Sequence, residues 1–520
     1  MISLNTRSGD LEFPFDIQDN VNDSQKGYKR SWLSDPIRNR IESPDVFENC
    51  TIRELILPIF EKKKLVTMSQ VSKKFRKYIK SEFIRRLNDR TTFEQLKAAG
   101  KDLEIIMIIN FLGEECLHLT KLDLRRGFSK IDDEDIKLIS EKFANLSHLA
   151  VHDKVRGVTA ASIDHFKKMT AIKNLVFLSD RRYDYPLNGF SFIEKYPNIE
   201  NLTLGAGLFK LDFLKECTLL KNLELHIAKM YANRFLISNN ESPLRLNECC
   251  PYLKSLYLNN FTNENLNFLD GCSLLENLRM ECCNRLSDLA SIGNCLALKK
   301  LRLSYGEFDN LNILKLKKLP HLEEISIYAC GNLTDISCVE GCSLSLKLVD
   351  IRQSFRSENL NLTPLKQCKQ LMGLDLTYCR VADITSLGNC INLEFLSLSF
   401  NSLLAEINSL SNLTKLKKLC LARTNVQDIS PLRFCTALEE LDLRGCNRLN
   451  RLIDICSLQN CHSLKKIIIS SFENQDNEFC YQTLKFLFPE TEIIVETINE
   501  SIFAFDDMNE VMRLTDFANL

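Results

Sequence analysis

Cysteine is the residue type most able to do chemistry in this 520-residue chain, which contains 21 cysteines and 7 histidines. Thiolates bind zinc or form disulfides when several of them come together. Metal sites usually use closely spaced Cys-x-x-Cys pairs, and the sequence contains none. The doublets Cys249-Cys250 and Cys282-Cys283 cannot easily direct both sulfurs at one metal. The spacing therefore favours buried free thiols over a metal site or a disulfide framework.

Patterns for other kinds of catalysis are also missing. The sequence lacks the phosphate-binding pattern GxxxxGK[ST], the nucleophile pattern GxSxG and the zinc-protease pattern HExxH. Cys461 and His462 are adjacent, but Cys461 belongs to a repeated row of cysteines, which indicates packing. We therefore expect no enzyme activity, no cofactor and no metal.

The bulk composition indicates a soluble globular protein, with 45% hydrophobic and 26% charged residues. The formal net charge of −1 gives no global attraction to nucleic acid or to an anionic membrane. No signal-peptide pattern begins the chain, and the longest apolar stretch, Ile105–Leu112, is too short to span a membrane. We expect a cytoplasmic protein, with the nucleus, or a host's cytoplasm for a microbial effector, as alternatives.

A repeated L-x-x-L-x-L pattern provides the elements that position these residues. Its clear copies begin at Leu253, Leu298, Leu371, Leu393, Leu416 and Leu438. Looser copies begin at Leu119, Leu146, Ile172, Ile199, Leu220, Leu275, Leu322, Leu346 and Leu464, which makes about fifteen repeats. From Leu253 to Leu438 the copies are 22 to 25 residues apart. This period is typical of leucine-rich repeats, so the chain resembles that family.

Two rows of cysteines follow the repeat. One row holds the turn position eight residues after the first leucine, which is Cys283, Cys330, Cys379, Asn401, Thr424 or Cys446. The other stands three residues before the first leucine, at Cys116, Cys217, Cys250, Cys272, Cys295, Cys368, Cys390, Cys435 and Cys461. These rows contain thirteen of the 21 cysteines, which favours a structural role for the thiols.

The limb that returns from each strand to the next also has a pattern. Steps of the form apolar-x-Asp-apolar, such as Val381–Ile384 and Val426–Ile429, predict brief turns or 3₁₀ segments. The earlier copies are 26 to 27 residues apart between Leu119 and Ile199, and Asp132–Phe143 among them is predicted to be a helix. We expect Lys229–Glu248 to loop outward, and a last helix and strand at Leu484–Phe488 and Ile493–Val495 to cap the array.

The predicted fold is thus an α/β leucine-rich-repeat solenoid, or horseshoe, over residues 91–498, with a short helical region before it. Residues 1–45 are polar and aperiodic, which predicts disorder, and residues 499–520 form a C-terminal tail. The tail carries apolar residues among acids, so it could be disordered or fold back onto the solenoid.

Residues 46–90 predict a helical hairpin. A capping-box pattern, Thr51-x-x-Glu54, opens the first helix, and Glu54–Phe60 and Leu65–Arg76 are similar to two motifs of the F-box. The resemblance implies a substrate receptor that recruits a target protein to a cullin-type ubiquitin ligase, with an adaptor bound at residues 50–86. It assigns the adaptor-binding face to Leu55, Ile59, Phe60, Leu65 and Val71. The alternative is that these residues form only the solenoid's N-terminal cap.

The same region is basic, with eleven Lys and Arg residues against three acids between Glu61 and Arg90. A nucleic-acid site would place this charge on one face with interleaved aromatic residues. A solvated helix face is the simpler interpretation.

The residues between the leucines of each strand predict where a partner binds, because they point into the concave side of such a solenoid. Tyr305, Tyr378 and Phe400 share one column, and Tyr328 lies in the next. Tyrosine and arginine are frequent in binding hot spots. The predicted partner surface is Arg279, Arg302, Tyr305, Tyr328, Arg352, Asp375, Tyr378, Phe400 and Arg423. We expect one protein partner here and a monomer otherwise; the alternatives are an ordinary polar surface, or a scaffold or effector (for example phosphatase-regulating) without a ubiquitin role.

Overall fold

The computed structural model describes residues 120–125, 131–153, 158–179, 188–206, 211–227, 245–261, 265–283, 286, 288–305, 319–329, 336–353, 359–449, 457–470 and 477–496. The chain divides into two units, Met1–Leu65 and Val66–Leu520, and every described residue belongs to the second. The segment 1–45, the F-box-like region 46–90 with all five adaptor-binding residues, and the tail 499–520 lie outside the described residues.

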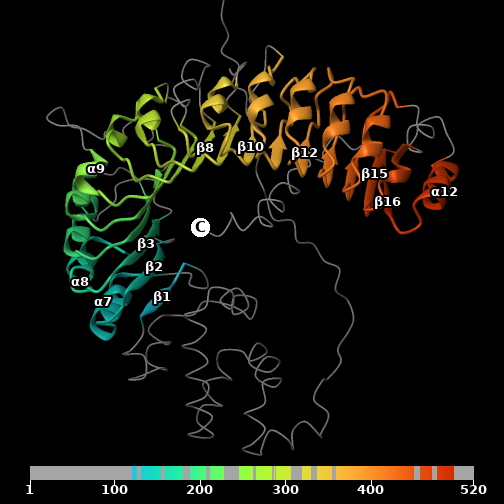
Figure 1. Ribbon diagram of the computed structural model, residues 1–520. Coiled ribbons are helices and arrows are strands. Elements are labelled where there is room, and N and C mark those ends of the chain that lie inside the picture. Colours follow the sequence, from blue (N-terminus) through green and yellow to red (C-terminus); the bar gives the residue numbers. More distant parts are fainter. Residues whose placement is uncertain are drawn as a thin grey trace, which may run out of the picture. The chain divides into compact units, whose positions relative to one another are not determined.

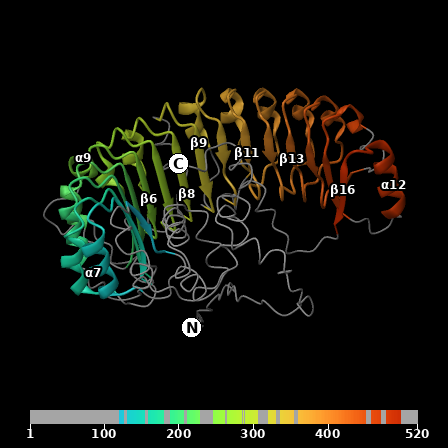
Figure 2. The ribbon, with the colours of Figure 1, turned by 90° about the horizontal axis from the view of Figure 1, so that it is seen from below.

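Sixteen parallel strands form one open sheet in which every strand pairs with its neighbours in the sequence. The strands are β1 (Lys121–Asp123), β2 (His148–Asp153), β3 (Asn174–Ser179), β4 (Asn201–Ala206), β5 (Asn222–Ile227), β6 (Ser255–Asn259), β7 (Asn277–Glu281), β8 (Lys300–Ser304), β9 (Glu324–Tyr328), β10 (Leu348–Asp350), β11 (Gly373–Asp375), β12 (Phe395–Ser397), β13 (Lys418–Cys420), β14 (Glu440–Asp442), β15 (Lys466–Ser470) and β16 (Glu492–Glu496). They line the concave side of the curved repeat array, and helical turns cover its convex side (Figure 1). Seen from below, the strands lie side by side (Figure 2). The leucine-rich-repeat solenoid predicted from the sequence is confirmed.

Each predicted copy of the motif coincides with one of the first fifteen strands. We number each copy from its first leucine as position 1, so that Leu298, Leu301 and Leu303 occupy positions 1, 4 and 6 of the copy around β8. All three are essentially buried, as are the equivalent residues of the other described copies. Burying one such side chain stabilises the fold by about 1.5 to 3 kcal/mol. Positions 5 and 7 therefore face the concave side.

The convex side changes along the array, as the repeat lengths predict. The α-helices are α7 (Asp133–Lys142), α8 (Ile163–Phe166), α9 (Leu246–Cys249) and α12 (Asn477–Leu487). The 3₁₀ helices are η4 (Ala160–Ser162), η5 (Asn188–Lys195), η6 (Leu211–Glu216), η8 (Asn267–Leu269), η9 (Ala290–Asn294), η11 (Ser337–Cys342), η12 (Thr363–Gln367), η13 (Thr385–Asn389), η14 (Asn408–Asn412), η15 (Ser430–Phe434) and η16 (Ser457–Asn460). Asp132 caps α7 at the predicted position. No helix in these described stretches is long and apolar enough to cross a membrane.

The prediction that Lys229–Glu248 loops outward is wrong at the C-terminal end of this segment. Leu246 and Cys249 stand on the short helix α9 and are buried in the core. Their apolar i, i+3 spacing places both on one helix face, which packs inward. The rest of that segment, residues 229–244, lies outside the described residues.

The aspartate of the apolar-x-Asp-apolar step starts the next 3₁₀ helix. The Asp383 carboxylate accepts hydrogen bonds from the backbone N–H (2.8 Å) and hydroxyl (2.5 Å) of Thr385, the first residue of η13. These bonds hold the pKa of Asp383 below its usual value. Asp428 accepts the same two bonds from Ser430 at the start of η15. The aspartate of the apolar-x-Asp-apolar step therefore accepts from a backbone N–H group at the helix start that would have no partner within the short helix.

Several of the cysteines before position 1 donate a hydrogen bond to the preceding repeat. The thiols of Cys390, Cys435 and Cys461 donate to carbonyls of Leu365, Leu410 and Leu432 at 3.4, 3.3 and 3.3 Å. Burial raises the pKa of Cys435 to about 12 and that of Cys461 to about 11. These thiols therefore stay protonated at neutral pH and act as small apolar groups with a weak donor.

Position 9, the turn position, satisfies backbone groups at the end of the strands. The Asn401 side chain is completely buried and accepts from the N–H groups of Cys379 (3.2 Å) and Val381 (2.9 Å). Its amide donates to the carbonyls of Leu376 (3.0 Å) and Leu398 (2.8 Å). One side chain thus links two neighbouring repeats.

Replacing Asn401 with alanine is expected to destabilise the protein by about 2 kcal/mol, because several buried backbone groups lose their partners. Denaturant unfolding followed by circular dichroism measures this loss. Thr424→Val is the matched control, since Thr424 holds the same position in the next repeat and its hydroxyl donates to the carbonyl of Leu421. A loss for Asn401→Ala no larger than that of the control would contradict this role.

The predicted C-terminal cap is present. Helix α12 precedes β16, and Leu484, Phe488 and Ile493 are buried at the end of the core. A terminal repeat must cover the apolar edge of its neighbour, which these side chains do.

Candidate protein-binding surface

Side chains at position 8 lie on a backbone conformation that L-amino acids rarely adopt. In nine successive repeats φ at this position is between 52° and 69°, at Asn260, Cys282, Tyr305, Ala329, Gln353, Tyr378, Phe400, Arg423 and Gly445. The geometry is set by the sheet, because the position 8 N–H donates to the position 7 carbonyl of the next repeat, as from Phe400 to Ala422 (2.7 Å). The strand then turns away at once.

This left-handed conformation costs a residue other than glycine about 1 to 2 kcal/mol, and asparagine tolerates it best of the others. Asn260 and Gly445 show that small residues meet the backbone requirement in this protein. A Cβ atom on Gly445 would lie 2.9 Å from Cγ of Arg423, so this glycine leaves room for the neighbouring arginine. Nothing in the backbone therefore requires aromatic rings at position 8.

Tyr378, Phe400 and Arg423 nevertheless form a stack along this column on three successive repeats. The Tyr378 and Phe400 rings are parallel to within 13° with centroids 4.3 Å apart. The Arg423 guanidinium lies 5.3 Å from the centre of the Phe400 ring. Tyr378 is 39% exposed. The arrangement presents a flat, partly apolar platform to the solvent.

A second aromatic pair lies toward the N-terminus. Tyr305 packs edge-on against Tyr328 with centroids 5.2 Å apart, and the Arg352 guanidinium lies 5.7 Å from the centre of the Tyr328 ring. Tyr305 is half exposed. Three repeats separate it from Tyr378, or about 14 Å at the usual strand spacing.

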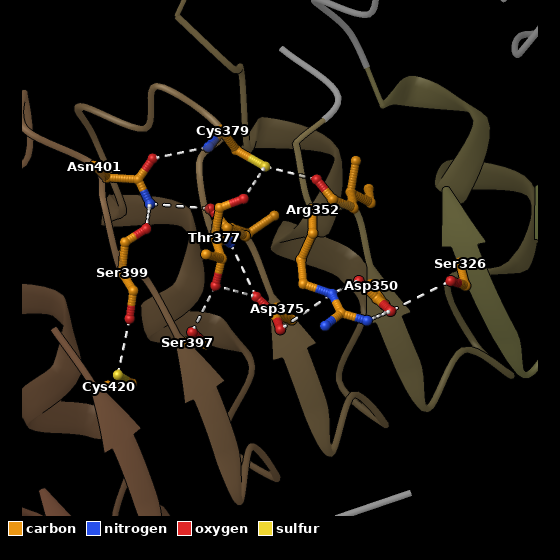
Figure 3. A network of polar contacts seen from close by, with 12 residues as sticks. Ser326, Asp350, Arg352, Asp375, Thr377, Cys379, Ser397, Ser399, Asn401 and Cys420 are labelled. Atoms are coloured by element: carbon orange, nitrogen blue, oxygen red, sulfur yellow. Dashed lines mark hydrogen bonds and ion pairs between the residues drawn. The ribbon is translucent and has the colours of Figure 1, made fainter. Parts of the chain in front are cut away.

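A buried ionic cluster lies between the two aromatic groups (Figure 3). Arg352 donates to both carboxylate oxygens of Asp350 at 2.8 Å and lies 3.5 Å from Asp375. Thr377 donates its N–H (2.9 Å) and hydroxyl (2.6 Å) to Asp375, and Ser326 donates to Asp350. One arginine thus holds two carboxylates together.

The titration of Asp375 shows the balance of charges in this cluster. Burial, followed by repulsion from Asp350, raises the pKa of Asp375 to about 6, although Arg352 and Thr377 act in the opposite direction. Below about pH 4 the carboxyl is protonated in both the folded and the unfolded protein. Above about pH 6 it is ionised in both, and the folded state carries the full cost of the buried charge.

The contribution of Asp375 to stability is therefore expected to fall as the pH rises from about 4 to 6. Asp375→Asn removes this titration. From pH 4 to pH 7 the unfolding free energy of the wild type should fall relative to that of the variant. The expected fall is on the order of 3 kcal/mol, at 1.36 kcal/mol per pKa unit. Denaturant unfolding at both pH values measures the change. A difference that is constant with pH would contradict the raised pKa.

A third group of side chains lies on β6 to β8. Arg279 donates Nε (2.8 Å) and Nη2 (2.6 Å) to Glu281 and lies 4.6 Å from the centre of the Tyr257 ring. The Tyr257 hydroxyl donates to the other oxygen of Glu281 at 2.8 Å. On the neighbouring strand Arg302 is the register partner of Arg279.

Eight of the nine residues predicted from the sequence belong to these three groups on the concave side, and the ninth, Asp375, belongs to the ionic cluster. Asp375 differs from the others because it is only 3% exposed and its carboxylate faces Arg352 and Thr377. Its place is beneath the surface, where it positions Arg352. Tyr257 was not among the predicted residues, although it stands at position 5 of the copy that begins at Leu253.

No cluster of three or more His, Cys, Asp or Glu side chains that could hold a metal ion occurs among the described residues. The described cysteines are all free thiols, and all except Cys282 and Cys420 are buried. Burial raises the pKa of Cys420 well above its usual value. The concave side presents aromatic rings, guanidinium groups and carboxylates.

Comparisons with known proteins agree with the fold. A family model described as leucine-rich repeats (2 copies) matches residues 414–460. A leucine-rich-repeat protein of Leptospira interrogans has a TM-score of 0.53 at 14% identity, over 72% of this chain and 94% of its own. An internalin of Listeria monocytogenes has a TM-score of 0.44 at 18% identity, over 66% of this chain and 90% of its own. No curated protein matches the sequence. The family model and the Leptospira protein support the fold and no further property.

Proposed function

We propose that this protein is a protein-binding module that holds its partner on the concave side between Arg279 and Arg423. The observation that carries the proposal is the set of bulky side chains at the left-handed position 8. Tyr305, Tyr378 and Phe400 each accept backbone strain where asparagine or glycine would fit, and the rings of Tyr305 and Tyr378 are exposed while that of Phe400 is half-buried. Strain that the fold does not require is typical of functional sites, and aromatic residues with arginine dominate protein interfaces.

The test is affinity purification with the wild-type chain and the variant Tyr305→Asn/Tyr378→Asn/Phe400→Asn, followed by quantitative mass spectrometry. Proteins bound through the concave side should be at least tenfold depleted with the variant. Gln353→Asn is the matched control, because Gln353 has the same backbone conformation in the same column. Equal recovery with all three proteins would overturn the proposal.

The more specific function is that of an F-box-like substrate receptor, in which residues 50–86 bind a ubiquitin-ligase adaptor and the solenoid holds the substrate. Its support is the sequence similarity of Glu54–Phe60 and Leu65–Arg76 to the F-box. In this proposal Leu55, Ile59, Phe60, Leu65 and Val71 contact the adaptor, and the protein is cytoplasmic. The alternative is an interaction scaffold or effector with no ubiquitin role, in which residues 46–90 cap the solenoid.

The double variant Leu55→Asp/Phe60→Asp distinguishes the F-box-like receptor from the scaffold. If the F-box-like proposal holds, the full chain co-purifies with an adaptor and a cullin, and the double variant loses both while it keeps the proteins bound to the concave side. Recovery of concave-side partners without any adaptor from the wild-type chain would favour the scaffold.

A further inference from the structure

Large apolar side chains lie exposed along one edge of the repeat array. They stand in the turns that lead into the strands, one or two residues before position 1. Because all the strands are parallel, these turns follow one another along the same edge, at the N-terminal ends of β5 to β12. We call this set the apolar edge, and the exposed fractions of its members are Leu219 40%, Tyr252 54%, Leu274 47%, Leu296 53%, Leu344 87% and Ile391 52%.

The fold does not require apolar residues in these turns. The equivalent turns later in the array carry exposed polar residues, namely Thr414, Thr436 and His462. Both kinds of turn have the same backbone hydrogen bond, in which position 1 donates to the carbonyl three residues earlier, as at Leu275 and Leu416. A contiguous exposed apolar surface on a soluble protein marks an interaction site. The apolar edge is therefore a candidate contact with another chain.

A row of charges that mostly alternate in sign runs beside the apolar edge, at position 2 of each repeat. Neighbouring members pair within the chain, as Glu276 does with Lys254 (3.0 Å) and Lys299 (2.7 Å). The lysine side chains of the row are nevertheless 40–55% exposed, and the glutamates 24–28%. From β5 to β12 the row is Lys221, Lys254, Glu276, Lys299, Glu323, Lys347, Met372 and Glu394.

This row is complementary to its own reverse. A two-fold axis between β8 and β9 would place β8 opposite β9 of a second copy, and β5 opposite β12. Moving the axis by one strand in either direction would bring like charges together, Lys221 with Lys347 or Glu276 with Glu394. With the axis between β8 and β9 all facing charges are of opposite sign: Lys299 with Glu323, Glu276 with Lys347, and Lys221 with Glu394.

The same axis matches the apolar edge with itself. It places Leu274 opposite Leu344 of the second copy. Lys369, which interrupts the edge at β11, comes opposite Tyr252, and an ammonium group is attracted to the face of an aromatic ring. Ion pairs at a protein surface add little affinity. The apolar contacts would therefore supply most of the attraction, and the charges would select the register.

We propose that two copies of this protein form a symmetric dimer through the apolar edge, with the two-fold axis between β8 and β9. This dimer replaces the monomer predicted from the sequence, and it does not depend on the proposed function of the concave side. Because the axis runs from the convex to the concave side, both concave sides open in the same direction and stay accessible. Two linked binding surfaces raise the avidity for a partner that carries two copies of the bound segment.

Sedimentation velocity of the full chain over a range of concentrations tests the proposal. The mass is expected to rise from one chain to two. Leu274→Glu/Leu344→Glu should raise the dissociation constant at least 100-fold, because both facing pairs of leucines become facing glutamates. Phe486→Glu is the matched control and should leave the dimer unchanged, since Phe486 is 85% exposed on α12, outside the apolar edge. A chain that stays monomeric at every concentration, or a dimer that the double variant does not weaken, would overturn the proposal.

A zero-length crosslink tests the register without any substitution. Carbodiimide joins a lysine directly to a carboxylate. Lys221 and Glu394 lie seven strands apart in one chain, which is roughly 33 Å along the sheet at the usual strand spacing, so an amide between them forms only between copies. Mass spectrometry of the crosslinked dimer is expected to find the Lys221–Glu394 peptide. A crosslinked dimer joined only through residues outside β5 to β12 would contradict this contact.

Discussion

Replacing Arg352 with methionine is expected to destabilise the protein by about 3 to 5 kcal/mol, the usual loss when one partner of a buried ion pair is removed. Asp350 and Asp375 are both buried, and each has Arg352 within ion-pairing distance. Without the guanidinium two adjacent carboxylates would remain with only hydroxyl and N–H donors. Denaturant unfolding measures the loss.

The matched control for this prediction removes all three charges together. Asp350→Asn/Arg352→Met/Asp375→Asn should recover most of the stability, because a neutral cluster of similar volume replaces a buried ionic one. A single variant that loses less than about 1 kcal/mol would mean that the carboxylates are solvated or protonated in the folded protein. A triple variant as unstable as the single one would assign the loss to packing instead of charge.

Tyr378→Asn/Phe400→Asn is expected to separate binding from stability. The affinity for a protein recovered on the concave side should fall at least 100-fold, since each hot-spot aromatic residue contributes about 2 kcal/mol or more. The free energy of unfolding should change by less than about 1 kcal/mol, because the lost ring stacking, worth about 0.5 to 1.5 kcal/mol, is offset by relief of left-handed strain. Calorimetry and denaturant unfolding measure the two quantities.

Gln353→Asn is again the control for the backbone change, and it should alter affinity less than threefold. If the double variant lost stability in step with affinity, the rings would be part of the fold. If neither quantity changed, the strained aromatic residues would have no role in binding.

The repeat could be predicted from the sequence because leucines at positions 1, 4 and 6 must share one buried face. That pattern alone located the first fifteen strands, β1 to β15, and identified which residues face the concave side. The cysteine rows were recognised in the same way, since their positions are fixed relative to Leu298 and its equivalents.

Other features depend on neighbours that sequence spacing does not show. Asp375 was expected at the surface, but Arg352, one strand away, covers it. The left-handed conformation of position 8 could not be predicted from Tyr305, Tyr378 or Phe400. Gly445 in the same column is a residue whose type indicates it. Leu246 and Cys249 fell in a long interval between repeats, where no periodicity indicated the short helix they form.

Binding of the partner on the concave side can be tested by site-specific photocrosslinking. A photoreactive benzoylphenylalanine is placed either at Gln353, in the position 8 column between Tyr305 and Tyr378, or at Leu344, which follows the convex helix η11 and is 87% exposed. The full chain carrying each probe is irradiated with its recovered partner, and the crosslinked peptides are identified by mass spectrometry. Partner peptides attached at position 353 and none at position 344 are the expected result. Partner crosslinks from position 344 alone would show that the partner binds the convex side and would contradict binding on the concave side.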